Sequence, residues 1–112
     1  MALGSHKVVA RFAAERAGVE GEKAHVTRSA FYASHPWLAQ LINHDGGSDR
    51  INQLFEGTRI DGIPVRVVEL TGEPGDVVIT HPLIAHSIAP NCASRPRFMR
   101  IARPRIRASD LS

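Results

Sequence analysis

Two histidines five residues apart are the clearest candidates for chemistry in this chain. His81 and His86 flank an apolar run at residues 82–85, and a β-branched run at residues 77–80 leads into them. A solvated loop has no need of apolar residues between two histidines, so the pattern predicts a lined cavity at a strand end. A neutral imidazole held rigidly by a strand suits Fe, Zn, Cu or Ni. His86 is therefore a candidate metal ligand.

An arginine follows this pair across a turn. Arg97 lies eleven residues after His86, beyond Pro90 and Asn91. This spacing allows Arg97 to emerge on a neighbouring strand and to aim its planar guanidinium at a carboxylate held near the metal. A lone histidine is more often structural or exposed than a ligand, and Arg97 is what favours a site here. The other histidines have less context, and we expect His25, His35 and His44 to be structural or exposed.

The first half of the chain is predicted to position this site with helices. Apolar residues recur at helical spacing over residues 6–17, with Ser5 as the expected N-cap and Gly18 as the stop. Residues 19–33 carry no sustained period and are predicted to be an irregular connection. Pro36 suits the first turn of a short helix through Ile42.

A second short helix is predicted after the Gly-rich residues 43–47. Ser48 is its expected N-cap and Gly57 its stop. We expect Ile51, Leu54 and Phe55 to face inward. This helix would complete a mainly helical first half, residues 1–57.

The second half is predicted to be mainly β, over residues 58–107. Residues 63–70 and 76–83 are rich in β-branched residues, and the Gly- and Pro-containing residues 71–75 between them favour a turn. A third strand is expected to begin near Arg97, and Arg103, Arg105 and Arg107 are expected to face solvent. The whole chain, residues 1–112, then forms one α+β domain.

Length, composition and charge exclude several classes of protein for this chain. The chain has 112 residues and a formal net charge of +3, which fits one globular domain. No apolar run approaches the roughly 20 residues of a membrane span, and the N-terminus does not resemble a secretory signal, so we expect a cytoplasmic protein. The single cysteine, Cys92, is an expected apolar filler. The arginine-rich residues 95–107 are interrupted by prolines and apolar residues, which argues against nucleic-acid binding.

Residues 75–86, followed by Asn91 and Arg97, resemble the C-terminal signature of the phytanoyl-CoA dioxygenase family of Fe(II)- and 2-oxoglutarate-dependent oxygenases. The segment at residues 4–6 is also similar to that family. The resemblance implies a double-stranded β-helix, the jelly roll of cupin-like proteins, here partial and preceded by short helices. It further implies Fe(II) and 2-oxoglutarate as cofactors, with His86 as the distal iron ligand and Arg97 binding the far carboxylate of 2-oxoglutarate. His81 would be a neighbouring residue that does not bind the metal.

One part of the expected iron site is missing from the sequence. Such a site needs two histidines and a carboxylate, usually beginning with His-x-Asp or His-x-Glu. The residues two places after each histidine are not acidic: they are Val8, Thr27, Trp37, Gly46, Leu83 and Ile88. We therefore interpret the chain as a fragment or truncated homologue of an oxygenase that hydroxylates a small organic substrate, and expect it to be inactive alone.

A second interpretation assigns the chain to a different class of protein, one without catalytic activity. The chain would be a non-catalytic, β-rich module that binds a small anion through Arg97 or associates with itself. Sheet edges left open by missing strands are commonly covered by another copy, so we expect a homo-oligomer. Neither interpretation requires a nucleic-acid or membrane partner.

Overall fold

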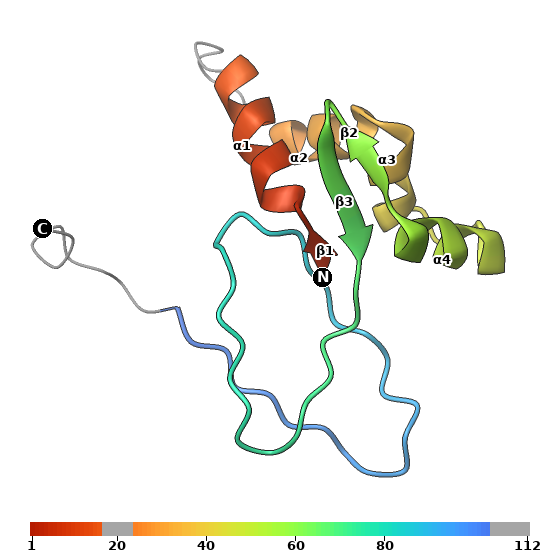
Figure 1. Cartoon of the computed structure of the whole chain (residues 1–112), viewed down its shortest axis with the longest axis vertical. Coiled ribbons are helices and arrows are strands. Elements are labelled where there is room, and N and C mark those ends of the chain that lie inside the picture. The colour runs from red at the N-terminus through yellow and green to blue at the C-terminus, as the bar shows by residue number, and fades with distance from the viewer. Residues whose placement is uncertain (17–23, 104–112) are drawn as a thin grey trace, which may run out of the picture.

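The computed structural model describes residues 1–16 and 24–103, which form a small α+β fold (Figure 1). In these residues three short strands and four helices follow one another along the chain. They are β1 Ala2–Leu3, α1 Ser5–Glu15, α2 Ala24–Ala33, α3 Pro36–Ile42, α4 Gly47–Glu56, β2 Thr58–Ile60 and β3 Ile63–Val67. Every helix and strand thus lies before residue 68.

The sheet is antiparallel, with the strand order β1-β3-β2. Strands β2 and β3 form a hairpin in which Ile60 pairs with Ile63. Both turn residues, Asp61 and Gly62, have positive φ angles, as the tight hairpin turn that matches strand twist requires. Strand β1 then pairs with the far end of β3, where Ala2 lies opposite Val67. The N-terminus therefore lies beside the point at which the chain leaves the sheet.

Glycine is required where β1 passes into α1. Gly4 has a φ of 82° and is the N-cap of α1. A Cβ atom at this position would collide with the carbonyl oxygen of Pro64 in β3. Glycine at this position therefore provides both the left-handed backbone and the space for α1 to approach the sheet.

The core lies between the helices and the sheet. Each described helix and strand contributes at least one buried side chain to it, and these are Ala2, Val8, Phe31, Trp37, Leu38, Leu54, Ile60 and Val65. Two polar contacts hold α3 in place. The His35 imidazole caps its start by accepting a hydrogen bond from the Trp37 N–H at 3.1 Å, and the Arg50 Nε donates to the Gln40 carbonyl at 2.6 Å near its end.

The predicted jelly roll is wrong. Residues 68–103 contain no regular strand, so the expected strands at residues 76–83 and near Arg97 are absent from the described chain. β-branched residues favour strands only where a neighbouring strand completes the hydrogen-bond ladder. The only sheet in the described residues is three-stranded and is already built from β1, β2 and β3. Within the predicted strand at residues 63–70, only β3 forms.

Other predicted elements need smaller corrections. Residues 24–33, expected to be irregular, form α2, whereas the predicted helix at residues 36–42 is confirmed as α3. The last predicted helix forms as α4, but Gly46 and not Ser48 is its N-cap. Of its three supposedly inward residues only Leu54 is buried, since Ile51 and Phe55 are exposed.

The chain beyond β3 makes two long excursions from the helices and sheet (Figure 1). It leaves β3 at residue 68, returns to β1 near residue 85 and then leaves again. The Cα radius of gyration of 16.4 Å exceeds the ~13 Å of a compact domain of this length. Arg105 and Arg107 lie outside the described residues.

Candidate functional site

The candidate site is positioned by a junction between β1, α1 and the returning chain. The Ala85 N–H donates to the Ser5 hydroxyl oxygen at 2.8 Å, and the Ala85 carbonyl accepts from the Ala2 N–H at 2.8 Å. Both backbone groups of Ala85 are thus bonded, which fixes the residue immediately before His86. The expected role of Ser5 as the N-cap of α1 is wrong, because Gly4 is the N-cap and Ser5 is the first helical residue. It holds the His86 segment instead.

Helix α1 and the returning chain also meet at a pair of imidazoles. The ring centroids of His6 and His81 lie 4.9 Å apart, with planes tilted by 35°. The Nδ1 atom of His81 accepts a hydrogen bond from the Leu83 N–H at 3.1 Å. In neutral His81 the proton therefore resides on Nε2, which has no lone pair for a metal. This geometry suits packing against His6 and does not suit ligation.

His86 has the opposite arrangement. Its Nδ1 lies 3.0 Å from the Ile84 carbonyl oxygen. Because a carbonyl can only accept, this contact requires the proton on Nδ1 and leaves the lone pair on Nε2. Metal-ligating histidines commonly donate their second N–H to a backbone carbonyl in this way. The side chain is exposed, so the Nε2 lone pair is open to a ligand.

A groove of about 410 Å³ runs beside His86. One wall is formed by Val9, Phe12 and Ala13 of α1, a second by part of α2, and a third by residues 83–86. Phe12 meets Phe31 of α2 edge to face, with ring centroids 5.4 Å apart. The groove therefore has an apolar and aromatic floor, as small-molecule sites commonly do.

A cationic side chain also borders the groove. The Arg28 guanidinium carbon lies 5.2 Å from the centroid of the Tyr32 ring, within the range of a cation–π contact. Among the described residues that line the groove none is acidic. Arg28 therefore favours a ligand that carries a carboxylate at this border of the groove. No periodic pattern marks α2 in the sequence, so Arg28 was not among the predicted site residues.

Arg97 does not line this groove. It is exposed, and its guanidinium makes one long contact of 3.5 Å to the Ala89 carbonyl. The turn before it is built by Asn91, whose amide nitrogen donates to the Arg95 carbonyl at 2.7 Å and whose amide oxygen accepts from the Ala93 N–H at 3.1 Å. The expected turn after His86 is thus present, although Arg97 does not return on a paired strand.

None of the other candidates lies in a group of metal-binding side chains within the described residues. His44 and Cys92 are exposed, His35 caps α3, and the side chain of His25 is outside the described part of the chain. Over residues 1–16 and 24–103, no three His, Cys, Asp or Glu side chains gather closely enough to hold a metal ion. His86 is therefore not part of a ready-made metal cluster in the described residues.

Comparison of the chain with protein-family models, curated proteins and solved structures found no match. The resemblance to the phytanoyl-CoA dioxygenase family consequently stays a prediction from the sequence. In the described ranges, none of the helices has the length and apolar character needed to cross a membrane.

Proposed function

We propose that this chain contributes part of an Fe(II)- and 2-oxoglutarate-dependent oxygenase site of the phytanoyl-CoA dioxygenase type and is inactive by itself. The observation that carries the proposal is the hydrogen bond from His86 Nδ1 to the Ile84 carbonyl. It favours the tautomer whose Nε2 can bind a metal. His35 and His81 accept hydrogen bonds through Nδ1, which favours the other tautomer.

The junction at Ala85 supports the same proposal because it orients the histidine. With both backbone groups of Ala85 bonded to β1 and α1, the adjacent His86 is carried on a fixed backbone. Arg97 follows the Asn91 turn and has no carboxylate partner among the described residues. Its fork of donors is available to a dicarboxylate such as 2-oxoglutarate.

The chain does not supply a complete metal site. No group of three His, Cys, Asp or Glu side chains in the described residues could hold a metal, and the sequence lacks His-x-Asp and His-x-Glu. A facial iron site needs a second histidine and a carboxylate. No catalytic step can therefore be assigned to this chain alone. Its proposed role is to present His86 and Arg97 to ligands supplied by another polypeptide segment.

Paramagnetic NMR with Co(II) tests whether His86 differs from an ordinary surface histidine. We expect the His86 imidazole signals to broaden at a Co(II) concentration about ten-fold below that needed for His44, since a second N–H bonded to a carbonyl strengthens a histidine ligand. Added 2-oxoglutarate should increase the broadening by binding both metal and Arg97. Arg97→Ala should remove that increase, whereas Arg59→Ala, a change on β2, should not.

Equal broadening of His86 and His44, with no response to 2-oxoglutarate, would contradict the proposal. The His86→Ala variant provides the background signal. The helical circular dichroism of each variant should match the parent chain, because His86, Arg97 and Arg59 are all exposed.

A further inference from the structure

Residues 69–103, here called the open segment, expose a large set of apolar side chains. Ile79 is 94%, Phe98 92% and Val77 83% exposed. The other large apolar side chains exposed in the open segment are Leu70, Val78, Leu83, Ile88, Met99 and Ile101. Scattered exposed apolar residues are ordinary, but a continuous stretch of chain with this many is typical of an interaction surface.

The backbone of the open segment is also largely unpaired. Its internal backbone hydrogen bonds, within the described residues, are confined to the turns Glu73–Asp76 and His81–Ile84. In an extended chain, alternate side chains share a face, so Val77 and Ile79 present one apolar face. Extended backbone with free N–H and C=O groups beside such a face is a template for another strand.

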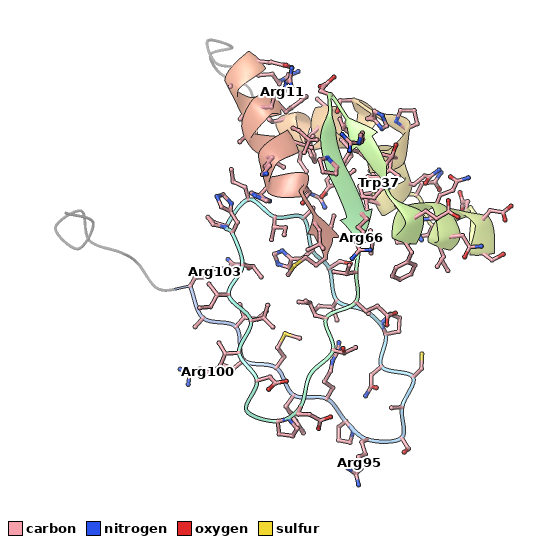
Figure 2. All side chains as sticks on the ribbon, in the orientation of Figure 1. Arg11, Trp37, Arg66, Arg95, Arg100 and Arg103 are labelled. Atoms are coloured by element: carbon pink, nitrogen blue, oxygen red, sulfur yellow. The ribbon has the colours of Figure 1, made fainter. Side chains whose placement is uncertain are left out.

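Acidic and basic residues are separated along the open segment. Residues 69–76 carry Glu69, Glu73 and Asp76 and no basic residue, whereas residues 95–103 carry four arginines and no acidic residue. All seven side chains are exposed. Figure 2 shows Arg95 and Arg100 directed away from the body of the chain. In the described residues, the ion pairs are formed by Arg11 and involve none of these seven charges.

We propose that the open segment is the surface through which two copies of this chain associate. In a two-fold symmetric pair the same patch occurs on both copies. The acidic run of each copy, residues 69–76, can then lie against the basic run of the other, residues 95–103. The two-fold axis repeats this contact, so the pair contains two such acidic–basic contacts. This complementarity is what selects a second copy as the partner. Association would also cover the apolar face of Val77 and Ile79.

This inference does not rest on the proposed oxygenase role. Arg97 belongs to the basic run, but none of the substitutions that test association changes Arg97. His86→Ala should leave association unchanged. The dimer and the metal-binding proposal can therefore fail separately.

Sedimentation velocity of the full chain from about 1 to about 100 µM tests the association. We expect a reversible, concentration-dependent shift from one chain of 12.2 kDa to two. Val77→Lys and Ile79→Lys should each raise the dimer dissociation constant at least about ten-fold. Ile42→Lys, a change at an exposed position of α3, is the matched control and should leave it unchanged.

Charge reversal tests the symmetric arrangement. One variant carries Glu69→Lys and Glu73→Lys, and the other Arg100→Glu and Arg103→Glu. Each alone should stay monomeric, because like charges then face each other. An equimolar mixture should restore the two-chain species, and adding Ile79→Lys to both variants should abolish it.

A single-chain species throughout the concentration range would overturn the proposal, as would particles that grow without limit. Charge-reversed variants that still dimerise alone would also overturn it. Helical circular dichroism should be retained in every variant, because none of the substitutions touches a buried residue.

Discussion

Leu38→Ala is expected to lower the free energy of unfolding by about 2–5 kcal/mol. Leu38 lies in α3 and is fully buried in the core between the helices and the sheet. Removing its branched end leaves a cavity as well as losing apolar burial.

Urea unfolding followed by far-ultraviolet circular dichroism measures this loss. Ile42→Ala is the matched control, because Ile42 lies one turn later in the same helix and is about half exposed. It should cost less than about 1 kcal/mol. Both variants must be compared at one protein concentration, since any association of chains adds to the apparent stability. Equal losses for the two variants would show that α3 is not packed as described.

Ser5→Ala is expected to release the chain that carries His86. The buried Ser5 hydroxyl accepts the Ala85 N–H at 2.8 Å. Without it, that N–H is left unpaired at a cost of about 1–3 kcal/mol. The returning chain can avoid this cost by leaving β1, so we expect the Ala85 amide to exchange with solvent about ten- to a hundred-fold faster.

Amide hydrogen exchange by NMR measures the exchange rate of each backbone N–H and so tests whether the Ala85 amide is released. The Val68 N–H, which donates to the Met1 carbonyl at 2.9 Å, should change less, because it belongs to the end of the sheet. Ser48→Ala, at an exposed position of α4, should leave the Ala85 rate unchanged. An unaltered Ala85 rate in Ser5→Ala would contradict the role given to Ser5.

Local sequence signals were sufficient where an element depends on its own residues. Pro36 and the apolar residues that follow it predicted α3, and Gly57 marked the end of α4. The hairpin of β2 and β3 also has a local signal in Asp61-Gly62, which the prediction overlooked. Both residues adopt the positive φ angles for which this dipeptide is selected.

Elements that depend on distant contacts could not be predicted in the same way. Helix α2 has no sustained apolar period, and it is packed through Phe31 against Phe12 of α1. The β-branched residues 77–80 have high strand propensity, but no described strand pairs with them. Ser5 has the residue type of an N-cap, yet its hydroxyl is taken by Ala85, 80 residues away. Propensity does not identify such partners.

The candidate site likewise combines a feature that local residues predict with features that depend on contacts between elements. The spacing of His86, Asn91 and Arg97 predicted a histidine followed by a turn, and Asn91 does build that turn. The tautomer of His86 depends on the position of the Ile84 carbonyl. The groove beside it requires α1 and α2 to meet. Neither feature can be derived from residue spacing alone.

The proposed role of His86 depends most directly on which of its nitrogens carries the proton. Two-dimensional ¹H–¹⁵N NMR of the imidazole rings, recorded where the histidines are neutral, distinguishes the two tautomers. We expect His86 to be protonated on Nδ1, and His35 and His81 to be protonated on Nε2. Protonation of His86 on Nε2 would remove the lone pair that the proposal assigns to a metal, and would contradict the proposed site.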